Sequence, residues 1–325
     1  MRSDRLDFKE SIFMLNSLIL GTRGSALALA QTELTKAALK RAFPSLSVSM
    51  ETFITQGDKK LDLELLRQPS GGKGLFTKEL EDALFERRIE VAVHSLKDLP
   101  GNMPAGLVLG GVLERAATAD MLISKYPGGL DGLPHGSSVG TSSVRRARQL
   151  NWLRPDLKVN EWRGNVQTRL RKLGQQGAFS AILLAQAGLD RLGFSLVGGL
   201  LEFESAQFYV ASLEDRMFPA IGQGAIALQC EKERVPVLET LRVISHEPTW
   251  MAIRAERELQ RLLSGDCTLP VGVRTTVGTA SVRMEALLFE DGQKEPAHAK
   301  AEGAVPEEVA AAVARGLGVD PANLQ

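Results

Sequence analysis

Short apolar runs that end in a polar turn and lead into a helical segment recur along this chain. The first run, Leu18 to Leu20, predicts a strand, Gly21 to Gly24 predicts a tight turn, and Ser25 is expected to cap the helix that follows. The same order returns after Val139 and after Trp162. Units of this kind build α/β folds, in which ligands bind at the carboxyl ends of the strands.

The stretch VAVHSLKDLP, from Val91 to Pro100, places charged side chains at such a strand end. Its apolar half predicts a short buried strand, and Lys97 and Asp98 follow that strand. A carboxylate held beside a lysine there can exchange protons with a substrate or stabilise a developing positive charge. Aspartate also caps turns, so on this stretch alone both interpretations of Asp98 stay open.

Arginines follow a predicted strand that ends at Val139. Thr141, Ser142 and Ser143 stand at the start of the next predicted helix, where backbone amides bind anions. Arg145 and Arg146 lie in the opening turns of that helix, where positive side chains oppose the helix dipole. Either a bound anion compensates these charges, or they form a solvated basic face.

The next junction has the same character. Arg163 follows the strand predicted at 159–162, Arg169 lies in the helix after it, and Arg191 follows a further strand. Arginine captures carboxylates and phosphates through two parallel hydrogen bonds. Because one solvated face does not explain a repeated placement, the sequence predicts a ligand that carries several carboxylates or phosphates.

Two loops are further candidates for function. The polar stretch from Gln56 to Gly74 predicts a lid or a disordered loop, and its GGKG cluster lacks the spacing of a nucleotide-binding phosphate loop. Cys267 stands in the polar loop SGDCTLP, which presents a thiol, whereas Cys230 lies in an apolar strand. Cys267 is therefore a structural cysteine, an attachment site or a nucleophile.

Composition narrows the classes of partner. Lysine plus arginine equals aspartate plus glutamate at 39 each, so no overall field draws the chain to nucleic acid or to an anionic membrane. Two distant cysteines and four scattered histidines argue against a disulfide framework and a metal site. The apolar run from Ile12 to Leu20 is too short to span a membrane and makes a poor secretory signal, so we expect a cytoplasmic protein.

Eight short motifs follow one another along the chain. They are GTRGSALALAQ from Gly21, GGKGLFTKELE from Gly71, HSLKDLP from His94, GTSSVRR from Gly140, RGNVQTRLRKL from Arg163, AGLDRLG from Ala187, PAIGQGA from Pro219 and GDCTLPVG from Gly265. Each motif is weak alone, but in this order and spacing they are similar to hydroxymethylbilane synthases, also called porphobilinogen deaminases. The resemblance runs from about Leu18 almost to the C-terminus.

The resemblance implies three domains. Two are doubly wound α/β domains hinged like a bilobal binding protein, with the active site in the cleft between them, and the third is a small C-terminal α+β domain. After an N-terminal extension over residues 1–16, expected to be disordered, the implied limits are 17–114 with 220–243 for domain 1, 115–219 for domain 2 and 244–325 for domain 3.

The resemblance also implies a transferase activity in tetrapyrrole biosynthesis. Such enzymes join four porphobilinogen molecules head to tail with release of ammonia and then hydrolyse off the linear tetrapyrrole hydroxymethylbilane. A dipyrromethane cofactor, attached through a thioether at the position of Cys267, acts as primer. Asp98 is implied as the catalytic acid/base beside the pyrrole nitrogens, in a monomer without metal, nucleic-acid or membrane partners.

Further residues receive binding roles from the same resemblance. The cofactor set is Ser95, Lys97, Thr141, Ser142, Ser143, Arg145, Arg146, Arg169 and Gln223, and the substrate set is Arg23, Ser25, Lys73, Phe76, Arg163 and Arg191. Two positions depart from the family pattern. Ala117 to Asp120 replace an acidic, arginine-containing stretch, which puts a hinge contact in doubt, and Asp266 before Cys267 tends to raise the pKa of the thiol.

Two other classes of protein compete with this interpretation. A binding protein for a polyanionic small molecule uses the same kind of cleft, although Cys267 and the N-terminal sequence argue against it. A nucleic-acid binder would explain the basic run from Arg145 to Lys172, but the balanced charge and 5% aromatic residues give it little support.

Overall fold

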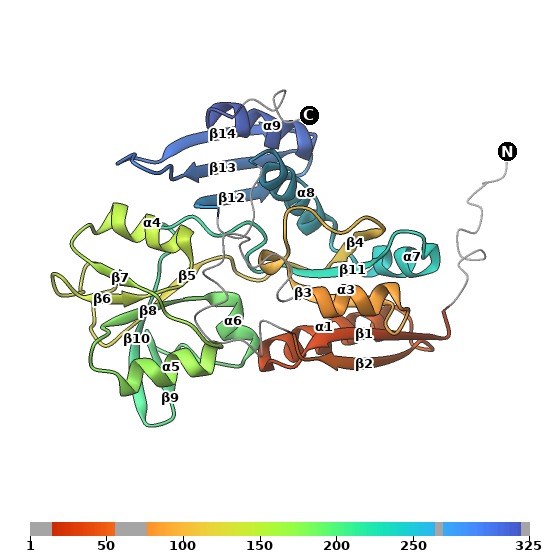
Figure 1. The fold of residues 1–325 in the computed structure, drawn as a ribbon, viewed down its shortest axis with the longest axis horizontal. Coiled ribbons are helices and arrows are strands. Elements are labelled where there is room, and N and C mark those ends of the chain that lie inside the picture. Colours follow the sequence, from red (N-terminus) through yellow and green to blue (C-terminus); the bar gives the residue numbers. More distant parts are fainter. Residues whose placement is uncertain (1–14, 56–76, 264–268, 320–325) are drawn as a thin grey trace.

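The computed structural model describes residues 15–55, 77–263 and 269–319. The predictions for Lys73, Phe76, Asp266, Cys267 and the loop at 56–74 lie outside the described residues, as does most of the 1–16 extension. Within the described ranges no helix is both long and apolar enough to cross a bilayer. Figure 1 shows two lobes side by side, with a third unit packed above them.

The first lobe is a five-stranded mixed sheet covered by helices on both faces. Side chains alternate along each strand, so Leu18 and Leu20 pack with two helices on one face, while Ile19 packs with a third helix on the other. The strand order is β2 (Ser47–Phe53), β1 (Ser17–Arg23), β3 (Val91–Ser95), β11 (Ile226–Glu231) and β4 (Leu107–Val112); the helices are α1 (Ala26–Ala42), α7 (Val235–Ile244) and α3 (Lys78–Phe85).

The second lobe repeats this plan with six strands. Leu122 and Leu183 pack toward α4, whereas Ile123 and Ile182 pack toward α5 and α6. The strand order is β7 (Lys158–Asn160), β6 (Ser138–Gly140), β8 (Ala181–Ala185), β5 (Asp120–Ser124), β10 (Ala206–Ser212) and β9 (Leu200–Phe203); the helices are α4 (Val144–Leu153), α5 (Val166–Gln175) and α6 (Gln186–Arg191).

The third unit is an antiparallel sheet that buries one face against two helices. Val273, Met284 and Val313 belong to its core and are fully buried. Its elements are β12 (Val271–Val277), β13 (Val282–Leu288), β14 (Ala297–Gly303), α8 (Glu247–Leu262) and α9 (Pro306–Gly316). The predicted fold class of two α/β lobes and a small C-terminal α+β unit is confirmed. The domain limits stay a prediction, because sheet membership does not define where a domain ends.

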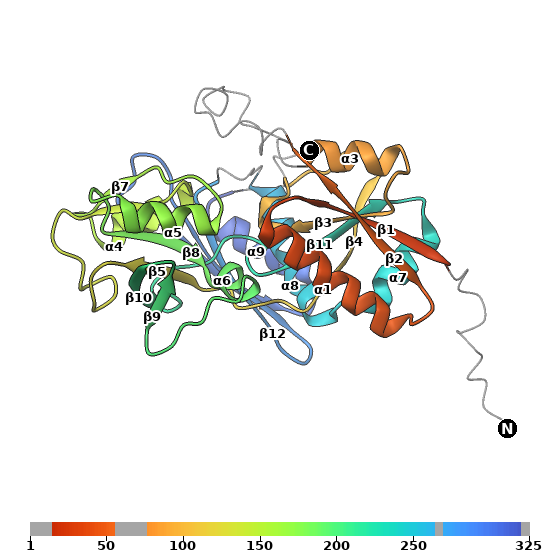
Figure 2. The same cartoon turned by 90° about the horizontal axis from the view of Figure 1, so that it is seen from below.

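The chain passes between the two lobes twice, and the two passages run side by side (Figures 1 and 2). We call residues 113–119 the first crossing and residues 213–225 the second crossing. Ala116 N donates to the Gly224 carbonyl at 3.2 Å, and Gly224 has a φ of +85°. A Cβ on Gly224 would lie 2.4 Å from the Ala116 carbonyl oxygen, so only glycine allows this approach. Both lobes are therefore joined by one paired connection.

Candidate active site

Asp98 ends a short 3-10 helix, η2 (Leu96–Asp98), directly after β3 of the first lobe. The turn is closed by the backbone, because Leu99 N donates to the Leu96 carbonyl. The Asp98 side chain is exposed, and no described residue donates a hydrogen bond to its carboxylate. The carboxylate is therefore available to a ligand, and the turn does not depend on it as a cap.

Lys97 beside it is half-buried and responds to charges from the second lobe. The pKa of Lys97 is lowered to about 8, mainly by burial and also by the charges of Arg146 and Arg145, while Asp98 and Asp120 partly oppose this shift. An ammonium group at the end of β3 thus lies within electrostatic reach of the start of α4. The two predicted clusters, one from each lobe, come together in the fold.

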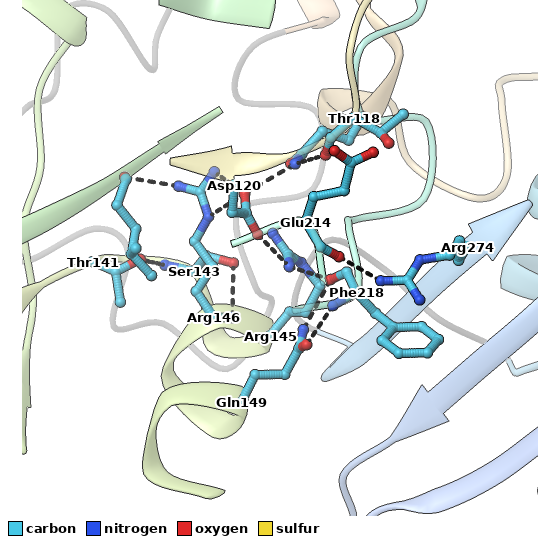
Figure 3. A network of polar contacts seen from close by, with 12 residues as sticks. Thr118, Asp120, Thr141, Ser143, Arg145, Arg146, Gln149, Glu214, Phe218 and Arg274 are labelled. Carbon is cyan, nitrogen blue, oxygen red and sulfur yellow. Dashed lines mark hydrogen bonds and ion pairs between the residues drawn. The ribbon is translucent and has the colours of Figure 1, made fainter. Parts of the chain in front are cut away.

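Arg145 and Arg146 share one buried carboxylate, that of Asp120 at the start of β5 (Figure 3). Arg145 Nη1 donates to Asp120 Oδ2 at 2.7 Å, and Arg146 Nη2 donates to Oδ1 at 2.6 Å. Burial alone would raise the pKa of Asp120, but the charges and hydrogen bonds of the two arginines hold it well below its usual range. Two cations against one anion leave this cluster with a net positive charge.

Gln223 of the second crossing joins the same carboxylate. Its Nε2 donates to Asp120 Oδ1 at 2.9 Å and to the Thr118 carbonyl at 2.6 Å. Its Oε1 and the Nε of Arg145 are buried without a hydrogen-bond partner among the described residues. An unused acceptor and an unused donor beside one ion-paired carboxylate are typical of a site that receives a polar ligand.

Arg169 on α5 brings a further cation near Asp98. Its Nε donates to the Gly164 carbonyl at 2.7 Å. The pKa of Arg169 is lowered to about 10, mainly by burial and also by the charges of Arg146 and Arg163, whereas Asp98 partly opposes this shift. Asp98 of the first lobe and Arg169 of the second lobe therefore act on each other across the space between the lobes.

The hydroxyl groups at residues 141–143 serve local structure. Ser143 caps α4 and accepts from Arg146 N at 3.4 Å, and Thr141 Oγ1 accepts from Ser143 N at 3.2 Å. Ser142 Oγ donates to the Trp162 carbonyl at 2.8 Å. The side chain of the cap thus takes one of the amide donors for which an anion would compete.

The other predicted residues also have partners within the chain. Ser25 caps α1 as predicted, and Ser95 Oγ exchanges hydrogen bonds with the Gln31 amide. Arg191 Nη2 donates to the Gly224 carbonyl at 2.6 Å, and Arg163 pairs with exposed Glu161. Arg23 ends β1, and its charge contributes to lowering the pKa of His94.

Sequence reasoning missed Asp120, which stood out only as part of a departure from the family pattern. Its signal was available, since a charged residue that opens an apolar strand needs a partner when the strand is buried. Arg115 was missed as well. Its guanidinium donates to the Gln223 carbonyl at 2.9 Å, so a contact between the crossings exists despite the changed residues at 117–120.

Comparison with known proteins identifies relatives of this chain. A family model described as porphobilinogen deaminase, dipyromethane cofactor binding domain, matches residues 18–239. A porphobilinogen deaminase from Brevibacillus brevis is 42% identical over 259 residues, 80% of each chain. Those from Synechococcus sp. strain CC9311 and Syntrophobacter fumaroxidans are 41% and 44% identical, over 86% and 78% of each chain.

Proposed function

The chain belongs to the porphobilinogen deaminase family, and from this premise we propose how Asp98, a set of cations and Cys267 divide the work of the active site. The enzyme is a hydroxymethylbilane synthase with a dipyrromethane cofactor: it condenses four porphobilinogen molecules and releases ammonia at each step. Family membership sets aside the binding-protein and nucleic-acid alternatives. The roles of individual residues are the proposal.

The residues around Asp120 fit a group such as dipyrromethane, which bears acetate and propionate side chains. Lys97, Arg145, Arg146 and Arg169 outnumber their acidic neighbours, and Arg145 Nε has no partner among the described residues. An anionic ligand would compensate the excess charge and satisfy that donor. When bound, the cofactor supplies the pyrrole carbon to which the first substrate is joined. Ser95, Thr141, Ser142, Ser143 and Gln223 complete the proposed cofactor set.

Asp98 is proposed as the catalytic residue. Loss of ammonia leaves a cationic pyrrole unit of the substrate, and an exposed carboxylate without other hydrogen bonds can stabilise that charge where it develops. The same Oδ atoms can accept the proton of a pyrrole N–H and return it. Lys97 and Arg169 interact with this carboxylate through their charges.

The substrate is proposed to bind at Arg23, Ser25, Lys73, Phe76, Arg163 and Arg191, and the arginines would hold its carboxylates. Arg163 can readily exchange Glu161 for a substrate carboxylate, because an exposed ion pair contributes less than about 1 kcal/mol to stability. Arg191 is half-buried and bonded to the Gly224 carbonyl, so its exchange requires movement beside the crossings. Since one chain supplies every proposed residue, we propose that the enzyme works as a monomer, in the reducing cytoplasm.

Intact-mass measurement tests the attachment site. The purified active chain is expected to carry one dipyrromethane, which Cys267→Ser removes. Cys230→Ser is the matched control: burial raises the pKa of the Cys230 thiol to about 12, so it is a poor nucleophile and should keep the added mass. A bare polypeptide mass from an active preparation, or loss of the group in Cys230→Ser, would refute the assignment.

A further inference from the structure

The second crossing is held on one side by α4, the helix that carries Arg145 (Figure 3). The Phe218 carbonyl accepts from Arg145 Nη1 at 2.5 Å and from Gln149 Nε2 at 2.9 Å. Phe218 N donates back to Gln149 Oε1 at 2.7 Å. The fully buried Gln149 therefore fixes both polar groups of the Phe218 backbone, and the Phe218 carbonyl in turn orients the Arg145 guanidinium.

The opposite side of the crossing is held by β12 of the third unit. Val273 N donates to the Pro219 carbonyl at 2.8 Å, and Arg274 Nη2 donates to the Glu214 carbonyl at 2.5 Å. The Arg274 guanidinium lies 4.4 Å from the centre of the Phe218 ring. Arg274 thus contacts the crossing at two points, four residues apart, on either side of the buried Met217.

The packing between β12 and Phe218 leaves no free space at Gly272. A Cβ built there would lie 2.6 Å from Phe218 Cβ and 3.0 Å from both Gln149 Nε2 and the Phe218 oxygen. Displacement of β12 is therefore passed directly to the Phe218 carbonyl. Arg145 would then keep only Asp120 as a partner, a carboxylate that it shares with Arg146.

We propose that Arg274 is a positioning residue for the active site: it holds the second crossing where the Phe218 carbonyl can orient Arg145. The inference rests on the proposed role of Arg145 in carboxylate binding. Arg274 itself lies on the third unit, and its guanidinium contacts the second crossing at Glu214 and at Phe218. Arg145 belongs to the proposed cofactor set, and porphobilinogen binds against that cofactor before it is joined to it. Loss of Arg274 should therefore weaken substrate binding more than it slows the chemical step.

Steady-state kinetics and hydrogen exchange on the cofactor-loaded enzyme test this inference. Arg274→Leu should raise KM for porphobilinogen about tenfold with little change in kcat, because a lost ground-state contact acts on binding. Exchange of the Phe218 amide should become faster. Gly272→Ala should likewise raise KM and speed hydrogen exchange at the Phe218 amide. Arg216→Leu, on the same crossing but paired with exposed Asp131, should leave both quantities at parental values.

A double variant separates positioning from general destabilisation. If Arg274 acts through Arg145, Arg274→Leu should add little to the KM of Arg145→Lys. If the two increases in KM multiply in the double variant, or if KM is unchanged in Arg274→Leu, the inference is overturned while the role of Arg145 stands. A parental KM in Arg145→Lys alone would instead remove the carboxylate role proposed for Arg145, and the inference with it.

Discussion

Arg115 and Glu256 form a bidentate ion pair that ties both crossings to the third unit. Arg115 Nη1 donates to Glu256 Oε1 at 2.6 Å and Nη2 donates to Oε2 at 3.1 Å, and the Glu256 side chain is 0% exposed. Glu256 Oε2 also accepts from Gly222 N at 2.7 Å. One carboxylate on α8 thus binds the first crossing through Arg115 and the second crossing through Gly222. The third unit therefore holds both crossings between the two lobes.

We expect Glu256→Gln to destabilise the protein strongly. Removing the charge leaves the largely buried Arg115 guanidinium without a counter-charge, which costs about 3 to 5 kcal/mol. Glu258→Gln on the same helix is the control, because its pair with Arg261 lies at the surface and contributes less than about 1 kcal/mol. Denaturant unfolding gives both values, and equal losses in the two variants would contradict the anchoring role of Glu256.

The buried His94 should make the free energy of unfolding depend on pH. Its Nε2 lies 3.0 Å from Gln229 Oε1, and Gln229 Nε2 donates to Glu81 Oε1 at 3.2 Å. A carboxylate only accepts, so Gln229 presents its oxygen to His94, and His94 Nε2 carries the proton. Burial lowers the pKa of His94 from its usual 6.5 to about 4, partly opposed by Gln229 and helped by Arg23.

The sign of this effect follows from the neutral folded form. Above pH 6.5 His94 is neutral in both states; between 6.5 and about 4 only the unfolded chain gains a proton, so the folded state should lose roughly 3 kcal/mol over that interval. Unfolding at several pH values should show a shallower acid slope in His94→Gln than in the exposed His298→Gln variant. Identical slopes in the two variants would show that His94 is not responsible.

Local elements of the fold were predictable because their signals are local. Ser25 caps α1 as its position indicated, and β3 is a buried strand that ends just before Lys97 and Asp98, as the apolar run predicts. The order of strands was not predictable. The apolar run of β11 indicates a buried strand, but nothing in the run says that it lies antiparallel between β3 and β4. That placement depends on pairing with residues more than a hundred positions away.

The candidate site shows the same limit. Arg145 and Arg146 oppose the dipole of α4, which indicates that they need a counter-charge. The alternative of a solvated basic face is wrong, because both side chains are buried. The nearest anion is Asp120, 25 and 26 residues earlier in the chain, and the sequence pattern does not show this pairing. A pattern of charges tells which counter-charge is needed, whereas the fold decides whether the chain or a ligand supplies it. Here Asp120 supplies one negative charge for two arginines.

Lys97 is proposed to bind the cofactor to which porphobilinogen is joined, and it should therefore make substrate binding dependent on pH. With its pKa lowered to about 8 by burial and by Arg146, the ammonium is present below that pH and is lost as pH rises through it. We expect KM for porphobilinogen to rise above about pH 8. Lys97→Arg should abolish this rise, because a guanidinium keeps its charge throughout that range. An unchanged alkaline limb in Lys97→Arg would assign the titration to another group.

Asp98→Asn distinguishes catalysis from a structural turn. The amide keeps the shape of the side chain but cannot carry negative charge or accept a proton in the same way. Turnover should therefore fall about 100-fold or more, with a smaller effect on substrate binding. Because the Leu99 N–H to Leu96 carbonyl bond closes the turn and no described residue donates to the Asp98 carboxylate, the melting midpoint should stay at the parental value.

Thermal unfolding and turnover measured on one Asp98→Asn preparation decide between the two roles. Asp82→Asn, on α3 of the same lobe, is a control for the loss of one negative charge and should retain parental turnover. A turn cap would tolerate asparagine with both properties nearly unchanged. Collapsed turnover with an unchanged melting midpoint supports proton transfer and charge stabilisation by Asp98. Near-parental turnover would remove Asp98 from the mechanism.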